Sequence, residues 1–385
     1  MAKARLYLDH NAGSPLRVEA RAAMLAVFER AGNPSSVHAE GRAARASVEA
    51  ARRQVAALVG AVADRVVFTG GGTEANVTVL SPRLRIGAGE VVVDTLIVGA
   101  TEHPSVLAGG RFPAERVRRL PVDGDGIARL DALGALLSEE RTAGRRALVS
   151  VMLANNETGV VQPVAAVAAV ARGHGALVHS DAVQAAGRIP VDIAALGVDF
   201  LTLSAHKIGG PQGVGAIVLG GDLAAPAPLV TGGGQEKGAR AGTQNVAGIA
   251  GFGAAAEAAR SEVEAGADAA RRDRLAAALG GAVLVGAAAE RLPQTLCVAV
   301  PGVPAETLVI ALDLEGAAVS SGAACSSGKV GPSHVLAAMG LSDEIARSAV
   351  RISFGWSTAD EELERFTDAW RRVMERLAPA VTRAA

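Results

Sequence analysis

The sequence contains little cysteine, few aromatic residues and almost no net charge. Two cysteines in 385 residues cannot form a disulfide framework, which suits a reducing compartment where a free thiolate persists. A net charge of −1 and an aromatic content of 3% provide neither a basic surface for nucleic acid nor rings on which bases stack. We therefore expect a cytoplasmic protein that does not bind nucleic acid.

Long apolar runs are also missing. Residues 1–5 lead directly into a strand-like segment, without the apolar stretch of a signal peptide. The mostly uncharged stretch at 208–230 is interrupted by Gly209, Gly210, Pro211 and Asp222, a composition that is wrong for a membrane helix. We expect no membrane segment.

Helix-like and strand-like patterns alternate along most of the chain, which is longer than one hydrophobic core usually serves. Predicted helices include 36–59, capped by Ser36, and 164–172. Strand-like runs lie at 66–69, 91–98, 147–153, 176–179, 200–203 and 214–219. This alternation predicts a mostly parallel α/β sheet that binds ligands at the carboxyl ends of its strands. After about residue 256, an Ala- and Arg-rich helix to about 279 and short strands predict a smaller α+β domain.

Lys207 follows an apolar run and precedes the glycine-rich turn at 209–211. At the end of a strand it would be partly desolvated. Because burial lowers the pKa of an amine, such a lysine is a Schiff-base candidate. Taken alone, Lys207 is also compatible with a surface lysine in a turn.

Two further polar features follow predicted strands. Asp181 ends the run at 176–180, where a carboxylate can pair with a protonated ring nitrogen. The glycine-rich loop at 69–74 leads into a predicted helix, so its N–H groups and the Thr73 hydroxyl can hold a phosphate. The loop alone would also allow a nucleotide site, although the Gly-Lys-Ser/Thr ending of such sites is missing. Loop, carboxylate and lysine together favour pyridoxal phosphate.

Several motifs support the same interpretation from end to end of the chain. They are YLDHNA at 7–12, GNPSSVH at 32–38, TEHPSV at 101–106, NNETG at 155–159, DAVQ at 181–184, SAHK at 204–207, GGGQE at 232–236 and VSSGAAC at 319–325. In these motifs the chain resembles cysteine desulfurases of the NifS/IscS-like group, within the class V aminotransferase family of pyridoxal-phosphate enzymes. The cysteine in the last motif is the most specific mark of the desulfurases.

The resemblance implies the fold and the assembly. The fold would be that of a fold-type-I pyridoxal-phosphate-dependent transferase. A large cofactor-binding domain at 12–256 would contain a mostly parallel seven-stranded sheet. A small α+β domain, made of 1–11 and 257–385, would carry the loop with Cys325. A homodimer would complete each phosphate site with Thr243 from the second subunit, and no metal would be needed.

The resemblance also implies roles for single residues. Lys207 would bind the cofactor covalently and carry a proton, Asp181 would pair with the ring nitrogen, and His103 would stack on the ring and perform acid–base work. Arg351 would bind the substrate carboxylate through its planar fork. The remaining contacts to cofactor or substrate would come from Asn11, Gly72, Thr73, Asn156, Gln184, Ser204, His206 and Thr243.

The two cysteines lie in different settings. Cys297 occupies a strand-like run and is expected to be a small buried apolar residue. Residues 320–328 contain only Ser, Gly, Ala and Cys325, which favours a mobile loop rather than a packed core. The resemblance makes Cys325 the nucleophile that takes sulfur from L-cysteine. The products would be L-alanine and a persulfide for an acceptor such as an iron–sulfur scaffold.

Some positions depart from the family pattern, and three alternatives remain. The departures are Gly13-Ser14 for a usual Thr-Thr, Val77 for Asn, Ala323 for Ser and Trp356 for Arg. They leave substrate preference less certain than the reaction class. A selenocysteine lyase or another class V aminotransferase would not depend on Cys325. A structural partner in sulfur transfer would leave the cofactor residues idle.

Overall fold

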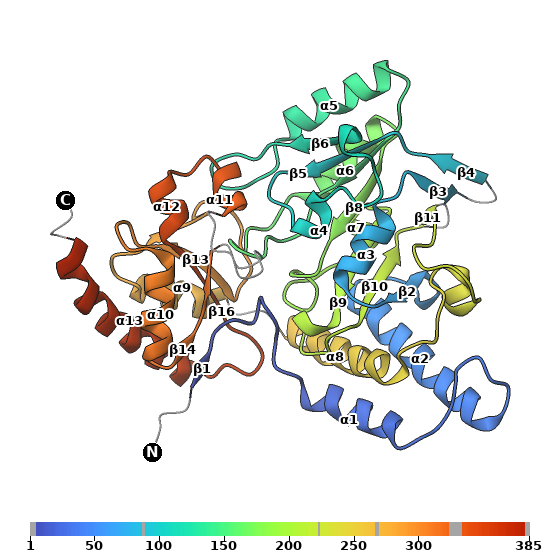
Figure 1. Cartoon of the computed structure of the whole chain (residues 1–385), viewed down its shortest axis with the longest axis horizontal. Helices are drawn as coiled ribbons and strands as arrows, with labels where there is room; N and C mark the ends of the chain where they lie inside the picture. The colour runs from blue at the N-terminus through green and yellow to red at the C-terminus, as the bar shows by residue number, and fades with distance from the viewer. Residues whose placement is uncertain (1–4, 87–88, 222–223, 266–268, 323–332, 382–385) are drawn as a thin grey trace.

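The computed structural model describes residues 5–86, 89–221, 224–265, 269–322 and 333–381 (Figure 1). Its largest sheet has seven strands in the order β2-β10-β9-β8-β7-β5-β6. These strands are β2 (Val66–Thr69), β5 (Thr95–Gly99), β6 (Val117–Leu120), β7 (Ala147–Ser150), β8 (Leu177–Asp181), β9 (Phe200–Ser204) and β10 (Gly215–Leu219). Only β10 runs antiparallel to its neighbours, so the prediction of a mostly parallel seven-stranded sheet is confirmed.

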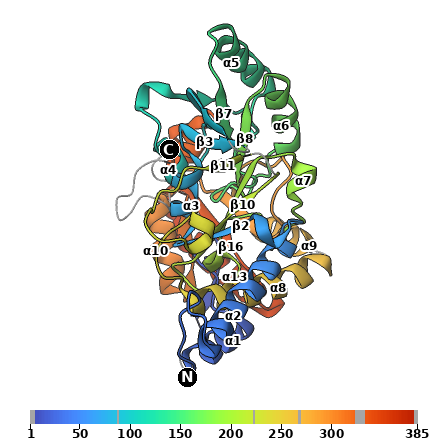
Figure 2. The same ribbon diagram turned by 90° about the vertical axis from the view of Figure 1, so that its right-hand side faces the viewer.

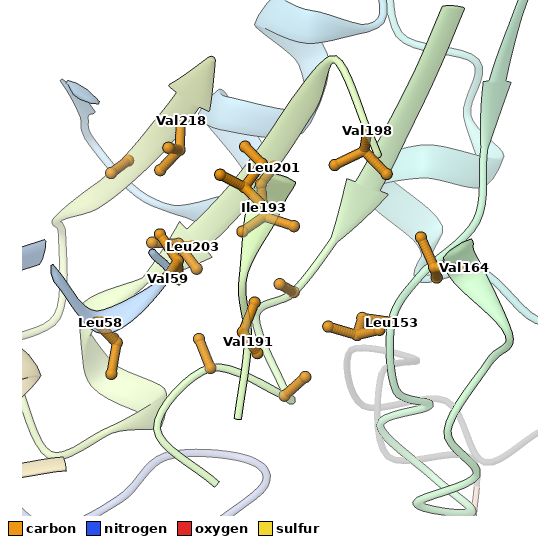
Figure 3. Close-up of a cluster of buried hydrophobic side chains, with 14 of the residues drawn as sticks. Leu58, Val59, Leu153, Val164, Val191, Ile193, Val198, Leu201, Leu203 and Val218 are labelled. Atoms are coloured by element: carbon orange, nitrogen blue, oxygen red, sulfur yellow. The ribbon is translucent and has the colours of Figure 1, made fainter. Parts of the chain in front are cut away.

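The central strands of this sheet are buried on both sides, because helices cover both of its faces. Every residue of β5, β7 and β9 is buried, as parallel strands between helical layers require. Ile97, Val149 and Leu201 belong to the apolar cluster on one face of the sheet. The residues before them, Leu96, Leu148 and Phe200, belong to the cluster on the other face, as the two-residue period of a strand dictates. Figure 3 shows part of the cluster that contains Leu201, together with Ile193 and Val218.

The helices of this part are α1 (Val18–Phe28), α2 (Ala39–Leu58), α3 (Gly72–Val79), α4 (Pro104–Leu107), α5 (Leu130–Thr142), α6 (Val164–Gly173), α7 (Ile193–Leu196) and α8 (Val246–Glu264). Figure 2 shows α5 and α1 at opposite ends of the molecule. A separate three-stranded sheet consists of β3 (Arg83–Ile86), β4 (Gly89–Val92) and β11 (Ala224–Pro226).

The C-terminal elements gather on one side in Figure 1. Their four-stranded sheet has the order β12-β13-β16-β15 and its own apolar cluster. The strands are β12 (Val283–Leu284), β13 (Thr295–Ala299), β15 (Ser320–Ser321) and β16 (Ala349–Ser353), and the helices are α9 (Ala269–Ala278), α10 (Ala305–Leu314), α11 (His334–Ala338), α12 (Asp343–Ser348) and α13 (Asp360–Val381). The first strand, β1 (Leu6–Tyr7), pairs with β14 (Ala317–Ala318) and so joins this part.

Three sequence expectations need correction. The helix predicted at 36–59 begins at Ala39, because His38 rather than Ser36 accepts the N–H of Gly41. The run at 91–98 forms two strands, β4 and β5, in different sheets. The predicted long helix ending near 279 is instead α8 and α9, and α8 starts already at Val246. The proposed domain boundary after residue 256 thus falls inside a helix that packs on α1 and α2. None of the helices in the described ranges combines the length and apolarity of a membrane span.

Candidate active site

A cavity of about 320 Å³ opens at the carboxyl ends of β2, β5, β7, β8 and β9. It is lined by Asn11, Ala12, Gly72, Thr73, Asn76, His103, Ser105, Met152, Ala154, Asn156, Asp181, Val183, Gln184, Ser204, His206, Lys207 and Arg351. Most residues singled out from the sequence therefore meet in one place. Thr243 is exposed and does not line this cavity, and Cys325 lies outside the described residues.

One end of the cavity is formed by the start of α3. Gly71 precedes this helix with a φ of +152°, a backbone conformation that residues other than glycine rarely adopt. A Cβ on Gly72 would lie 3.2 Å from Val183 Cγ2 and 3.3 Å from Ser204 Cβ, so a side chain would crowd this end. Because the first N–H groups of a helix have no intrahelical partner, this end favours an anion such as a phosphate.

Ser204 and His206 lie beside this helix start. Ser204 Oγ and His206 Nδ1 are 2.9 Å apart. Burial lowers the pKa of His206 to about 4, with Lys207 and Arg188 reinforcing the shift. His206 is therefore neutral at pH 7 and can serve as a hydrogen-bond partner rather than as a fixed charge.

Asp181 is the last residue of β8 and is almost fully buried. Its Oδ1 accepts the backbone N–H of Val183 at 2.9 Å, and its Oδ2 accepts Asn76 Nδ2 at 2.8 Å. These donors hold the carboxylate at the edge of the sheet, where a positively charged ring nitrogen would find a partner.

His103 precedes α4, and its Nδ1 accepts the backbone N–H of Ser105 at 3.1 Å. Burial lowers the pKa of His103, Lys207 and His334 lower it further, and Asp181 opposes them. The ring is thus held by the start of the helix that it caps. Its place in the cavity wall agrees with the predicted stacking, which stays a proposal.

Lys207 ends the short 3₁₀ turn Ala205–Lys207 that follows β9. Its Nζ donates to the backbone carbonyls of Asn11 at 2.6 Å and Ala12 at 2.9 Å. The N-terminal segment therefore holds the amine in the cavity. We call the part of the cavity formed by Thr73, His103, Asp181, His206 and Lys207 the cofactor end.

The substrate end is the part formed by Asn11, Asn156 and Arg351. Arg351, in β16, is 1% exposed and forms an ion pair with Asp9 at 2.7 Å. Its Nη1 donates to the carbonyl of Asn156 at 3.0 Å, and its Nη2 also donates to Ser320 Oγ at 3.2 Å. Within the described ranges its Nε has no hydrogen-bond partner, so a donor remains for a carboxylate.

Asn11 connects several segments at this end. Its Nδ2 donates to the carbonyl of Asn156 and to Thr295 Oγ1, both at 3.1 Å. Its Oδ1 accepts Arg188 Nη1, and its backbone carbonyl accepts Gln184 Nε2 at 3.0 Å. The amide is thus used within the protein, and a direct contact of Asn11 with substrate stays a proposal.

Sequence reasoning gave no role to Asn76, Ser105, Glu102 or Arg188. Asn76 lies three residues after Thr73, a spacing that places both on one face of α3, and this signal was available. Glu102 is buried, accepts the Met152 N–H, and has its pKa raised well above the ordinary value by burial and by Asp181. Burial also lowers the pKa of Arg188 to about 9, with Arg351 reinforcing it. No local pattern marks these buried titratable groups.

The residues present fit pyridoxal phosphate. The cofactor end offers an amine for its aldehyde, a buried carboxylate for its ring nitrogen and a helix start for its phosphate. Gln184 Oε1, which lies in the cavity wall and is buried, finds no hydrogen-bond partner among the residues that the structure describes. A polar ligand would satisfy it.

Comparisons with known proteins agree with this geometry. The family model "Aminotransferase class-V" matches residues 6–366. A cysteine desulfurase of Cereibacter sphaeroides is 43% identical over 97% of this chain and 96% of its own length, and the cysteine desulfurase IscS of Dictyoglomus turgidum is 37% identical over 97% and 96%. The structure of a NifS-like protein from Rickettsia africae covers 96% of this chain and 99% of its own, with a TM-score of 0.83 and 32% identity. The resemblance stated from the sequence is thereby confirmed, and the chain belongs to the class V aminotransferase family, among its cysteine desulfurases of the NifS/IscS-like group.

Proposed function

We propose that this protein is a pyridoxal-phosphate-dependent cysteine desulfurase, which removes the sulfur of L-cysteine to give L-alanine and a persulfide on Cys325. The observation that carries the proposal is the convergence of four residues on one cavity: Lys207, Asp181 and His103 from the carboxyl ends of separate strands, and Arg351 from within β16. Lys207 would attach the cofactor covalently and Asp181 would pair with its ring nitrogen. His103 would stack on the cofactor ring, and Arg351 would bind the substrate carboxylate. The relatives that are similar over nearly the full length are named cysteine desulfurases.

The cofactor end would hold pyridoxal phosphate, which, when bound, supplies an electron sink for the bonds at the substrate Cα. Lys207 would bind it covalently and later take and return the Cα proton, since its amine already lies in the cavity. Asp181 would hold the ring nitrogen in its protonated form. Gly72, Thr73, Ser204 and His206 would hold the phosphate, and Gln184 and Asn156 would contact the ring or its substrate neighbourhood.

The substrate end would bind the carboxylate of L-cysteine. Arg351 is fixed by Asp9 and by the carbonyl of Asn156, so its planar group is oriented before substrate arrives. Its Nε, which has no hydrogen-bond partner among the described residues, would supply a charge-assisted hydrogen bond. Asn11 would help to shape this end from the N-terminal segment.

We assign the nucleophile to Cys325, because Cys297 is unsuited to that role. Cys297 is fully buried in β13, and burial, followed by Glu157, raises the pKa of its thiol to about 12. At neutral pH it therefore stays a thiol, whereas the thiolate is the nucleophile. With two cysteines in the chain, a protein thiolate has to come from Cys325.

Chain connectivity supports the same choice. Ser320, in β15, pairs with Arg351 and accepts a hydrogen bond from it. Cys325 follows Ser320 by five residues, and an extended chain of that length spans at most roughly 17 Å. We therefore infer that the Cys325 thiol could reach a substrate held by Arg351.

The assembly and partners follow from the family. We infer a cytoplasmic homodimer in which Thr243 of each subunit completes the phosphate site of the other, since Thr243 is exposed in the single chain. The persulfide would pass to an acceptor protein, such as a scaffold for iron–sulfur clusters. Light scattering at micromolar concentration should show a dimer. An active, cofactor-bound monomer would contradict the role of Thr243.

The central experiment compares two serine variants. Cys325→Ser should keep the cofactor and still bind L-cysteine but produce almost no alanine or sulfide, because a hydroxyl is a far poorer nucleophile toward sulfur. Cys297→Ser, the matched control, should lose ~1–3 kcal/mol of stability through a buried hydroxyl and keep near-normal turnover. The assay is alanine production with a reductant, from L-cysteine and from L-selenocysteine.

Each opposite result has a defined meaning. Full alanine production from L-cysteine by the Cys325 variant would contradict the persulfide step and favour a lyase. Loss of activity only in the Cys297 variant would mean that the roles of the two cysteines are exchanged.

A further inference from the structure

A chain of buried hydrogen bonds runs beneath the cofactor end, from β7 to α3. Ser150 Oγ lies 2.9 Å from His179 Nδ1, and His179 Nε2 lies 3.0 Å from Thr202 Oγ1. Thr202 Oγ1 then contacts Asn76 Oδ1 at 2.6 Å. All four side chains are almost fully buried, so each donor and acceptor has to be matched within the protein.

The chain continues from Asn76 to two residues of the cavity wall. Asn76 Nδ2 donates to Asp181 Oδ2 at 2.8 Å and to Ser105 Oγ at 2.9 Å. Ser105 Oγ lies 2.8 Å from His103 Nδ1, which also accepts the backbone N–H of Ser105 at 3.1 Å. Asp181 and His103 are thus connected through the Asn76 amide and the Ser105 hydroxyl.

The direction of each hydrogen bond can be worked out from the chemistry of the groups. The Asp181 carboxylate only accepts, so Asn76 turns its Nδ2 toward it and its Oδ1 toward Thr202. The Thr202 hydroxyl has one proton, which it gives to Asn76 Oδ1, so it accepts the Nε2–H of His179. His179 Nδ1 then accepts the proton of Ser150. Burial lowers the pKa of His179 to about 3, in agreement with a neutral ring.

The same reasoning fixes the proton of His103. A backbone N–H can only donate, so His103 Nδ1 has to present its lone pair to Ser105. Ser105 Oγ already accepts from Asn76, and its own proton is therefore free to go to Nδ1 as a second donor. The proton of the neutral ring remains for Nε2.

We propose that Ser105 and Asn76 are positioning residues that hold His103 as the neutral tautomer with its proton on Nε2. His103 then enters the reaction with a proton to donate at Nε2. This role rests on the proposed function, in which the group that receives the hydrogen bond is the sulfur of L-cysteine. A donor there orients the sulfur without removing its proton, so that the Cys325 thiolate would form the S–S bond while the C–S bond breaks and its electron pair stays with the substrate carbon, which is then protonated to give alanine.

The charged surroundings of His103 agree with this assignment. Burial lowers the pKa of His103, Lys207 and His334 lower it further, and Asp181 opposes them. His334 Nε2 lies 2.9 Å from the carbonyl of Glu102, next to His103 in the chain. A proton on Nδ1 would break the hydrogen bond that Nδ1 accepts from the backbone N–H of Ser105. The two donors on Nδ1 therefore favour the neutral ring, in addition to the lowering of its pKa by burial.

Nuclear magnetic resonance of the full-length protein with ¹⁵N-labelled histidine tests the assignment directly. The measurement is made on the protein as purified with its cofactor and again after cofactor removal, with His103→Gln to identify the signal among seven histidines. We expect a protonated, pyrrole-type Nε2 and an unprotonated, pyridine-type Nδ1. A protonated Nδ1, or signals averaged between both tautomers, would overturn the proposal.

Variants separate positioning from a merely structural role. Ser105→Ala removes one donor from Nδ1, so the pKa of His103 should rise by about half a unit or more, and Ser105→Thr should restore it. Thr78→Ala, in the helix α3 that also contains Asn76, removes a buried hydroxyl that donates to the carbonyl of Glu74, and should leave the His103 signals unchanged. An unchanged pKa in Ser105→Ala would contradict the role of Ser105. If the signals are as expected but alanine is not produced, the proposed function fails and the tautomer assignment stands.

Discussion

The cofactor end and the substrate end of the cavity are built in different ways. The cofactor end takes its side chains from the carboxyl ends of neighbouring strands in one sheet, and a buried hydrogen-bond chain supports them. The substrate end joins the N-terminal segment, the β7 side of the sheet and β16 through Asn11, Asn156 and Arg351. One end is thus preorganised by local topology, and the other depends on contacts between residues more than 140 positions apart.

If the two ends are independent, the strongest change at the cofactor end should leave the fold intact. Lys207→Ala should abolish covalent attachment of the cofactor completely, because the amine is removed. Borohydride reduction followed by mass analysis of the labelled peptide measures this. The chain has three other lysines, Lys3, Lys237 and Lys329, and label on any of them in the wild type would overturn the assignment of Lys207.

A change at the substrate end should affect binding without affecting the cofactor. Arg351→Lys cannot reproduce the planar contacts to Asp9 and Asn156, so kcat/KM for L-cysteine should fall about tenfold or more, since a charge-assisted hydrogen bond contributes about 1.5–3 kcal/mol. Cofactor absorbance should stay. Arg272→Lys, at a buried arginine on α9 that bonds the carbonyls of Arg291 and Leu292, is the matched control and should leave KM unchanged. Equal losses in both variants would mean a general loss of stability.

The stability of the region next to the substrate end should also depend on pH through Glu157, which follows Asn156 in the chain. Burial raises the pKa of Glu157 to about 7, above its ordinary value of 4.5, so the folded protein binds the extra proton between these values. The stability from this proton is present below pH 4.5 and is lost as the pH rises through 7. Glu157→Gln removes this dependence, so its unfolding free energy relative to wild type should increase by ~2 kcal/mol between pH 5 and 8. Denaturant unfolding of cofactor-free protein at fixed concentration measures it, and a constant difference would contradict a neutral Glu157.

The smallest effect is expected outside both ends, at Trp356. Its Nε1 donates to the carbonyl of Pro15 at 3.2 Å, and the guanidinium of Arg17 lies 5.0 Å from its ring. Trp356→Phe replaces the indole by a smaller aromatic ring and loses the Nε1 hydrogen bond, which should cost ~1 kcal/mol without changing alanine production. A large loss of activity would show that the region beside the N-terminal segment belongs functionally to the substrate end.

The two ends also differ in what their sequence reveals. Lys207, Asp181 and Thr73 each follow an apolar run, so strand periodicity and the geometry of a parallel sheet are enough to predict that they lie close together. Asp9 and Arg351 carry no such signal, because 342 residues separate them and only the pairing of distant strands brings them into contact. The family resemblance predicted Arg351, but not that Asp9 orients it. Asn76 was missed although it shares a helix face with Thr73, and Glu102 was missed because a buried acid looks like any other glutamate in a sequence.

The pairing of β1 with β14 also determines when the site can exist. Asn11 is held by Ser353 Oγ, and its carbonyl receives the Lys207 amine. During synthesis the seven-stranded sheet can be complete once residue 219 has emerged, but β14 and β16 are made much later. A nascent or truncated chain therefore lacks the contacts that position its lysine and its arginine. Sulfur chemistry would begin only when the whole polypeptide is present, so that incomplete chains would not release sulfide in the cell.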